Sequence, residues 1–362
     1  MLAVLLASSL TACAGPPEVR LHGPGDYPER LSAWGVVTLN GDQLRLGRGV
    51  VPYEVATPLF SDYALKLRTI YLPDGTAMRY RAAQSFDFPT GSIISKTFFY
   101  PHDDGHALAV SGWSGDVTAL NTDDYRLVET RLLVKEDNGW SALPYVWEGD
   151  DAYLRITGAV VPIRLALADA RGTAEIPYVV PARSECAGCH ATDHDEGSLE
   201  LIGVKARHLN QPYPGQERSQ LQAWEQQGRL TEVPEAASRP VSVAWDDPRA
   251  SVEQRARAYL DSNCGHCHSP DGPAATSGLM LDAHTSAYRP LGFCKPPIAA
   301  GRGTGGRPYS IVPGQPDRSI LIHRMETSDP ATRMPETGRS LAHLEAVELL
   351  RRWVRELPGE CV

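Results

Sequence analysis

The chain has 362 residues, and at roughly 100–200 residues per domain this length excludes a single small module and favours two or three domains. Hydrophobic residues make up 42% and charged residues 22%, so the chain has enough apolar side chains to bury a core and is expected to fold. Its 44 acidic residues exceed its 35 lysines and arginines, which gives a net charge of −9 and argues against nucleic acid as a partner.

The amino-terminal segment is typical of an export signal. Residues 2–10 are apolar but far fewer than the roughly 20 residues that a membrane-spanning helix needs. The string Leu10-Thr11-Ala12-Cys13 resembles a bacterial lipobox, in which the cysteine is acylated and becomes the first mature residue. We therefore predict a signal peptide over residues 1–12, a lipid on Cys13, and a periplasmic protein anchored to the outer membrane. A cleaved secretory signal without lipid is the alternative and leads to the same compartment.

The front of the chain is predicted to be a β-rich domain over residues 24–180, sandwich-like or barrel-like. The dipeptides Asn40-Gly41, Asp74-Gly75 and Asn138-Gly139 are strong hairpin-turn signals. Alternating and β-branched runs between them predict strands at residues 35–40, 67–73, 77–81, 92–101, 125–136 and 153–159.

No catalytic pair of side chains stands out in this β-rich part. Its acids Asp62, Asp87 and Glu129 are expected to be solvated or to cap turns. The tryptophans Trp34, Trp113, Trp140 and Trp147 either pack in the core or line a ligand face, and the second possibility would make this part a binding module.

Four of the seven cysteines occur in two copies of one pattern, Cys186-Ala-Gly-Cys189-His190 and Cys264-Gly-His-Cys267-His268. This Cys-x-x-Cys-His pattern is the attachment signature of c-type haem. Two thiols at this spacing reach both vinyl groups of one porphyrin, and the adjacent histidine lies beneath the iron as a ligand. We predict two covalently attached haem c groups, with His190 and His268 as iron ligands.

Two other uses of paired cysteines are less consistent with the sequence. A zinc ribbon usually holds its two cysteine pairs about 15–20 residues apart, and these pairs are much farther apart in the chain. A thioredoxin-like redox pair needs a βαβ context, which neither motif has.

The first motif, in a haem segment predicted over residues 181–245, follows an extended run rather than a helix. Its distal iron position could be filled by His194, His208 or Lys205, by a residue from another domain, or by nothing. We prefer His208, for which a solvent-facing loop residue is the alternative. An open iron could bind peroxide and catalyse a reaction. A short helix predicted over residues 217–228 would pack over this porphyrin.

The second motif lies between two predicted helices, within a domain expected over residues 248–362. Residues 251–262 open with a Ser-x-x-Gln capping box and lead into Cys264, and residues 340–354 repeat apolar residues at helical spacing. Met334, followed by a proline, lies in the loop between them and is predicted to be the second ligand of the second iron, because a thioether is a soft ligand that raises the haem potential. The order of these elements resembles a class I cytochrome c domain.

The remaining candidates in this region receive structural roles. His266, inside the second motif, is expected to point away from the iron, and His323 and His343 to occupy surface or helix-packing positions. Met280 and Met325 are expected in the core. The expected fold class is therefore multidomain, with a β-rich N-terminal domain followed by mainly α-helical cytochrome c-type haem regions.

Almost the whole chain resembles a little-characterised bacterial family of dihaem c-type cytochrome lipoproteins. The strings that carry the resemblance are residues 57–63 (TPLFSDY), 86–89 (FDFP), 129–133 (ETRLL), 186–190 (CAGCH), 292–297 (GFCKPP) and 334–336 (MPE). The resemblance implies haem binding at His190 and His268, Met334 on the second iron, and electron transfer. Lipid and haem would use five of the seven cysteines, and the two that remain, Cys294 and Cys361, would be able to pair in an oxidising compartment if they lie close enough.

These features predict a protein that passes single electrons between a partner dehydrogenase or reductase and a respiratory carrier, an electron carrier rather than a stand-alone enzyme. A peroxidase-like enzyme using an open first haem is the alternative from the enzyme class. A binding module in the β-rich part, with the haems as a relay, is the second alternative.

Overall fold

The computed structural model describes residues 15–110, 112–167, 172–191 and 199–361. The predicted signal peptide, the predicted lipidation site Cys13 and the candidate ligand His194 lie outside these residues. The strands are β1 Val37–Asn40, β2 Gln43–Leu46, β3 Val51–Tyr53, β4 Leu65–Tyr71, β5 Met78–Arg79, β6 Ile93–Asp103, β7 His106–Leu108, β8 Tyr125–Glu136, β9 Gly139–Glu148, β10 Asp151–Leu154, β11 Ala159–Ala166, β12 Thr173–Val180 and β13 Leu230–Thr231. The α-helices are α1 Ala187–His190, α2 Ala206–Leu209, α3 Gln220–Gln226, α4 Val252–Asn263, α5 Ile320–Glu326 and α6 Leu344–Glu356.

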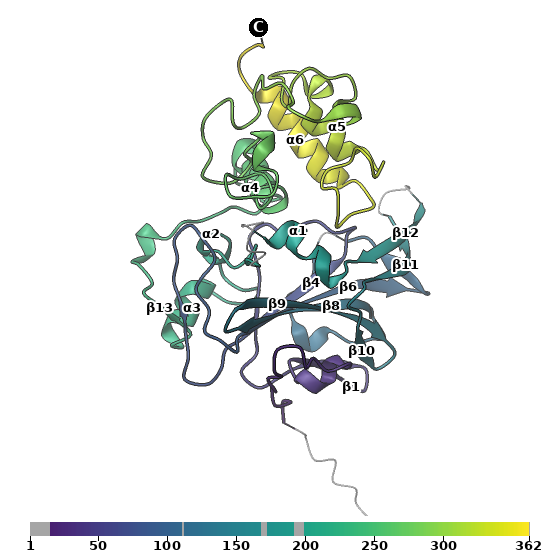
Figure 1. Ribbon diagram of the computed structural model, residues 1–362, viewed down its shortest axis with the longest axis vertical. Helices are drawn as coiled ribbons and strands as arrows, with labels where there is room; N and C mark the ends of the chain where they lie inside the picture. The colour runs from purple at the N-terminus through teal and green to yellow at the C-terminus, as the bar shows by residue number, and fades with distance from the viewer. Residues whose placement is uncertain (1–14, 111, 168–171, 192–198, 362) are drawn as a thin grey trace, which may run out of the picture.

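A nine-stranded sheet dominates the described chain (Figure 1). Its main path runs β10-β9-β8-β6-β7-β11-β12, and β4 joins β3 to β6. The neighbours are antiparallel except β7 and β11. Two predicted turns join paired strands, because Asn40 pairs with Gln43 and Glu136 pairs with Gly139, each across a two-residue loop. The predicted turn at Asp74-Gly75 does not make a hairpin, since β5 pairs with the distant β13.

Both sides of this sheet are covered by apolar side chains. Trp34, Leu67, Phe99 and Leu132 belong to a core under one face, where the indole of Trp34 donates to the Tyr145 hydroxyl at 2.7 Å. Residues 201–230 pack against Ile70 and Ile94 of the sheet, so the segment after the first motif lies on the β-rich part. Trp113, Trp140 and Trp147 also pack against these clusters, which supports the core interpretation of the tryptophans.

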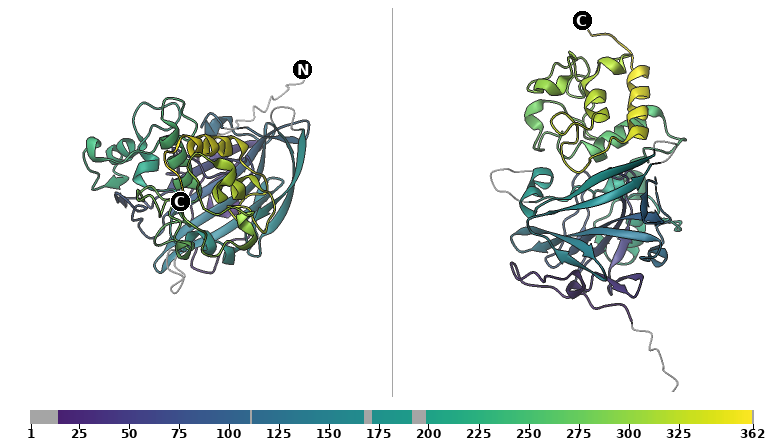
Figure 2. Two further views of the ribbon diagram at one scale, coloured as in Figure 1. Left: turned by 90° about the horizontal axis from the view of Figure 1, so that it is seen from above. Right: turned by 90° about the vertical axis from the view of Figure 1, so that its right-hand side faces the viewer.

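The C-terminal part stands above the sheet and has a core of its own (Figures 1 and 2). Leu260 of α4, Ile322 of α5 and Trp353 of α6 meet there. The predicted helix over residues 251–262 is confirmed as α4, and Ser251 and Gln254 form the expected capping box.

The C-terminal helix α6 starts at Leu344 and not at Ser340 as predicted. The backbone N–H groups of Ser340 and Leu341 donate instead to the Asp62 carboxylate at 2.7–2.8 Å, which holds this entry segment in a non-helical conformation. The short helix expected over residues 217–228 is α3, with Ser219 as its N-cap.

The predicted fold class is wrong, because the chain after residue 180 is not mainly α-helical. In the described residues its helices are 4 to 13 residues long, and between Cys267 and α5 only short 3-10 turns occur. Prolines explain much of this, since 17 of the 29 in the chain follow residue 180 and each removes a helical N–H. Glycines at positive φ, such as Gly278 and Gly292, add further helix ends. The chain is a mainly β protein without a substantial helical cytochrome c region.

Two of the three acids expected at solvated or turn-capping positions are buried. Glu129 is fully buried on β8, where it pairs with Arg131 and accepts from the Tyr178 hydroxyl at 2.7 Å. Asp62 is 4% exposed and joins the sheet to the entry of α6. Neither role could be read from the sequence, because Tyr178, which donates to Glu129, and the α6 entry segment, which donates to Asp62, are distant in the chain. No helix among the described residues is long and apolar enough to cross a membrane.

Candidate cofactor site

The two Cys-x-x-Cys-His motifs adopt the same backbone turn on different elements. The carbonyl of Cys186 accepts from the N–H groups of Cys189 and His190 at 3.3 and 3.0 Å. The carbonyl of Cys264 accepts from Cys267 and His268 at 3.1 and 2.8 Å. The first turn is the short helix α1, and the second follows directly from the end of α4. Each turn therefore gives both thiols and the histidine of its motif one fixed local arrangement.

The histidine that closes each motif is held through its Nδ1 atom. His190 Nδ1 lies 2.7 Å from the carbonyl oxygen of Glu200, and His268 Nδ1 lies 3.1 Å from that of Leu279. A carbonyl can only accept, so Nδ1 carries the proton in both rings and Nε2 keeps its lone pair. Burial lowers the pKa of His190 to about 4 and also lowers the pKa of His268. Both rings are thus neutral and oriented, as a metal ligand requires.

The four motif cysteines are free thiols, whereas Cys294 and Cys361 form a disulfide with a Cα–Cα distance of 5.2 Å. The distance that the sequence left open is therefore short enough for this pair. The disulfide joins the loop after Met280 to the carboxyl terminus. It leaves Cys186, Cys189, Cys264 and Cys267 available for covalent attachment or for metal binding.

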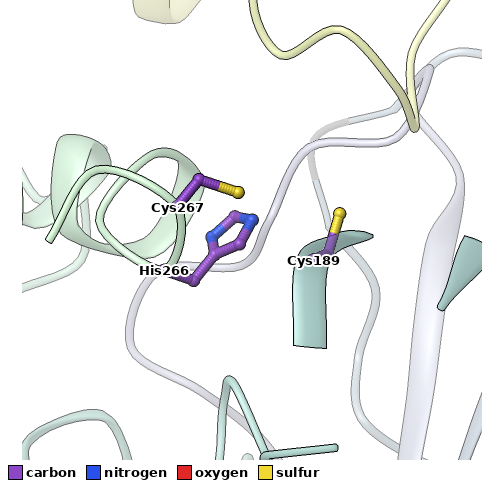
Figure 3. A group of neighbouring side chains, drawn as sticks. All are labelled: Cys189, His266 and Cys267. Carbon is purple, nitrogen blue, oxygen red and sulfur yellow. The ribbon is translucent and has the colours of Figure 1, made fainter. Parts of the chain in front are cut away.

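The two motifs meet although they are distant in the chain (Figure 3). The side chains of His266 and Cys267 point toward Cys189, and their ligand atoms all lie within 4.8 Å of one another. Hydrogen bonds from the Cys267 thiol and from the His266 ring lower the pKa of Cys189. The bond between the two cysteines raises the pKa of Cys267. The His266 Nδ1 atom is buried and has no hydrogen-bond partner within the part of the chain that the structure describes.

Met334 lines a cavity that Cys264 also lines, whereas His268 is not among the lining residues. Met325, which we expected to be a core residue, lines it as well while also packing in the C-terminal core. The buried Arg339 guanidinium holds the Met334 loop, donating to the carbonyl of Met334 at 2.8 and 3.0 Å and to that of Arg324 at 3.0 Å. The cavity is narrow, so a porphyrin joined to Cys264 would displace side chains that now fill it.

Among the cavity residues that sequence reasoning did not place at the site are Phe60 and His343. Their rings are stacked, with centroids 4.2 Å apart and an interplanar angle of 9°. His343 Nδ1 also lies 3.1 Å from the Tyr259 hydroxyl, and burial lowers the pKa of His343 to about 4. His343 has the helix-packing role that we expected, but at the cavity itself. Phe60 lies in the string over residues 57–63, which carried the family resemblance and was the available signal.

The preferred distal ligand of the first motif, His208, is held through Nε2, and its Nδ1 atom has no hydrogen-bond partner among the described residues. It is 4% exposed on α2, and its Nε2 atom lies 3.3 Å from the Asp261 carboxylate of α4. Arg207 binds the same carboxylate through two hydrogen bonds of 2.7 and 2.9 Å. His208 is therefore neither a solvent-facing loop residue nor a ring with a free Nε2. Lys205, another candidate, has a pKa lowered by burial and by the neighbouring Arg207.

Comparison with known proteins found no matching protein family, no similar curated protein and no similar solved structure.

Proposed function

We propose that this chain is a dihaem c-type cytochrome that transfers single electrons. One haem would be attached at Cys186 and Cys189 with His190 as iron ligand, and the other at Cys264 and Cys267 with His268. The observation that carries the proposal is the repeated geometry of the two motifs. Both have the same turn, two free thiols, and a neutral histidine whose Nδ1 donates to a backbone carbonyl.

The residues of each motif have the chemistry for covalent attachment of a porphyrin, namely two free cysteines and an oriented histidine. Each free thiol can add across one vinyl group, its sulfur bonding to one vinyl carbon while the thiol proton goes to the other carbon. When bound, haem supplies an iron that changes oxidation state by one electron. The surrounding residues orient the two histidines, keep both rings neutral and limit the access of water. Met334 is the proposed second ligand at the second motif, in the loop that Arg339 holds.

The proposed address and partners rest on the sequence. A lipid on Cys13 would anchor the protein to the outer membrane with its body in the periplasm. The proposed partners are a dehydrogenase or reductase on one side and a respiratory carrier on the other. A chain with a net charge of −9 favours a partner with a basic docking patch, so electron transfer between the two proteins should slow as salt is added.

The test is expression of the full chain in a host that matures c-type cytochromes. We expect a denatured gel band that retains haem, and a mass that exceeds the polypeptide and lipid by two haems. The paired variant C186S/C189S should lose one haem and C264S/C267S the other, whereas C294S/C361S should keep both. A colourless wild-type protein without added mass would refute the proposal. A high-spin first haem whose spectrum shifts with peroxide would favour a peroxidase-like activity.

A metal ion held by Cys189, His266 and Cys267 is the second candidate, favoured by the contact between these three residues. Two thiolates and one imidazole are ligands that zinc accepts, with a water molecule in the fourth position. The two candidates exclude each other, because a thioether sulfur no longer provides a thiolate. H266A separates them. It should abolish zinc binding under the second candidate and leave both haems attached under the first.

A further inference from the structure

Three cations face one another across the sheet, on the side of the first motif. Arg68 of β4 is directly opposite Lys96 of β6, and Lys96 is directly opposite Arg131 of β8. Lys66 lies two residues before Arg68, on the same face and opposite Phe98. The charged groups of Lys66, Lys96 and Arg131 lie 5.5, 5.3 and 4.7 Å from the centre of the Phe98 ring. Like charges at directly opposed positions destabilise a sheet, so this arrangement needs compensation.

Within the described ranges, the two arginines of this face are paired with a carboxylate and the two lysines are not. Arg68 binds Glu54 at 3.0 Å, and Arg131 binds Glu129 through hydrogen bonds of 2.8 and 2.6 Å. Lys66, 7% exposed, donates to the carbonyl of Ala64 at 2.7 Å. Lys96 donates no side-chain hydrogen bond within the described part of the chain, where its contact is the Phe98 ring. Among the described residues, neither Lys66 nor Lys96 forms an ion pair with a carboxylate, although the charge of Glu54 raises the pKa of Lys66 and that of Glu129 raises the pKa of Lys96.

Electrostatics shows the same imbalance. Burial, followed by repulsion from Arg131 and Arg68, lowers the pKa of Lys96 to about 7. Burial and the same neighbouring cations lower the pKa of Lys66 well below its usual value. A bound anion would offset the repulsion between the cations. It would also accept hydrogen bonds from both ammonium groups and so reduce the cost of burying them in their charged form.

This cationic face lies close to the first motif. α1 stands over the sheet between it and the C-terminal part (Figure 1). Lys96 is near enough to Cys189 and His190 to affect their titration, and Arg131 is near enough to affect Cys186. From the C-terminal part, His343 faces the same region and is influenced by Lys66.

We propose that Lys66 and Lys96 bind a pair of carboxylates, and that these are the two propionates of the haem attached to Cys186 and Cys189. This inference rests on the proposed function. The charges balance, since two lysines meet two carboxylates, and the thiols beside the site tether the porphyrin that carries them. The paired Arg68 and Arg131 shape the site without contributing net charge. A free dicarboxylate offers the same chemistry, so the test separates the two sources.

The first measurement is a redox titration of the dihaem protein that follows each haem by its spectrum. K96Q should raise the ratio of oxidised to reduced first haem at a fixed potential by about tenfold, because an uncompensated propionate stabilises the ferric iron. K66Q should act in the same direction, and K96R should restore the wild-type ratio. K135Q is the matched control, because Lys135 lies four residues from Arg131 on the same face of β8, over the Trp140 ring at 5.6 Å.

The dependence of the first-haem potential on pH also distinguishes a lysine paired with a propionate from a lysine that titrates alone. If a propionate is paired with Lys96, the wild-type potential should stay flat from about pH 6 to 8. K96Q should then gain a slope, because its propionate takes up a proton on reduction. A wild-type slope that K96Q abolishes would mean that Lys96 titrates without a carboxylate, and would overturn the proposal.

The second measurement separates propionate from a free anion, with succinate as the probe. C186S/C189S, which lacks the first haem, should gain thermal stability on addition of succinate, and K96Q in that background should not. The dihaem protein should show no response. A response of the dihaem protein that depends on Lys96 would overturn the propionate assignment. Wild-type protein with fewer than two haems would refute the proposed function itself.

Discussion

Single histidines define the candidate site more sharply than the cysteines do. His190 and His268 are tied through Nδ1 to backbone carbonyls, which leaves Nε2 of each ring as an unprotonated ligand atom. His208 is bound to Asp261 through Nε2. His343 packs flat on Phe60 and borders the cavity of Cys264 and Met334. The hydrogen-bond partner of each ring thus decides which of its two nitrogens keeps the lone pair that a metal ion needs.

Met334 is expected to control the potential of the second haem. A thioether ligand favours ferrous iron more than an imidazole does, so M334H should lower the midpoint potential of one haem and leave the other unchanged. M325L is the matched control, because Met325 lines the same cavity and should leave both potentials in place. Potentiometry of the purified protein measures both. A lower potential in M325L with no change in M334H would assign the ligand to Met325.

His343 should make stability depend on pH. Its pKa is about 4 in the folded chain against an ordinary value of 6.5, so the unfolded chain binds a proton that the folded chain does not. Its contribution is present above pH 6.5 and is lost as the pH falls toward 4. Between pH 7 and 4.5 the free energy of unfolding should fall by about 2 kcal/mol less in H343F than in the wild type. Urea titrations measure this difference. H106F, which removes a histidine of β7 that does not line the cavity beside His343, is the matched control.

The elements that carry the motifs are short and depend on their ends. α1 is one turn, and α4 ends at the cysteine that opens the second motif. The N-terminus of α4 is secured by the reciprocal bonds of Ser251 and Gln254, at 3.2 and 3.0 Å. The position of the second motif therefore depends on a helix whose start is fixed twelve residues earlier.

Removal of the α4 cap should weaken the C-terminal part. S251A leaves the Gln254 N–H without its acceptor and is expected to lower the free energy of unfolding by about 1 kcal/mol. S238A is the control, because Ser238 is exposed at the end of a short 3-10 turn and should change stability little. Urea denaturation followed by circular dichroism gives both values. Equal stability of S251A and S238A would contradict the capping role.

At the scale of the whole molecule, buried polar contacts join the sheet to the C-terminal part. The Asp62 carboxylate accepts the backbone N–H groups that precede α6. Arg207 of α2 and Asp261 of α4 form an ion pair whose side chains are 8% and 3% exposed. The backbone N–H of Phe60 donates to Asn263 at 2.7 Å. These contacts hold the two Cys-x-x-Cys-His motifs face to face.

Breaking the Arg207–Asp261 pair should uncouple the two parts. D261N leaves the buried Arg207 guanidinium without its counter-charge and should lower the free energy of unfolding by about 3–5 kcal/mol. The double variant R207M/D261L removes both charges and should be considerably less destabilised. E175Q is the surface control, because its partner Arg164 is exposed and such pairs contribute less than about 1 kcal/mol. Thermal or urea unfolding measures the stability of all three variants. A double variant less stable than D261N would contradict the argument.

The sequence by itself determined the features that arise within a few residues. Bonds between near neighbours form the motif turns, the capping box of α4, and the two-residue hairpins at Asn40-Gly41 and Asn138-Gly139. Residue type and spacing were therefore enough to predict these features. The helical regions predicted after residue 180 were wrong, because two periodic segments were extended over a stretch where prolines and glycines end helices.

Only the tertiary structure decided which distant residues meet. Packing between the two parts of the chain brings Cys189 to Cys267 and His208 to Asp261. Strand register places Arg68, Lys96 and Arg131 opposite one another on neighbouring strands. No spacing in the chain encodes them. A shift of one residue in register would move those cations to the opposite face of the sheet, and only the packing of the complete molecule fixes that choice.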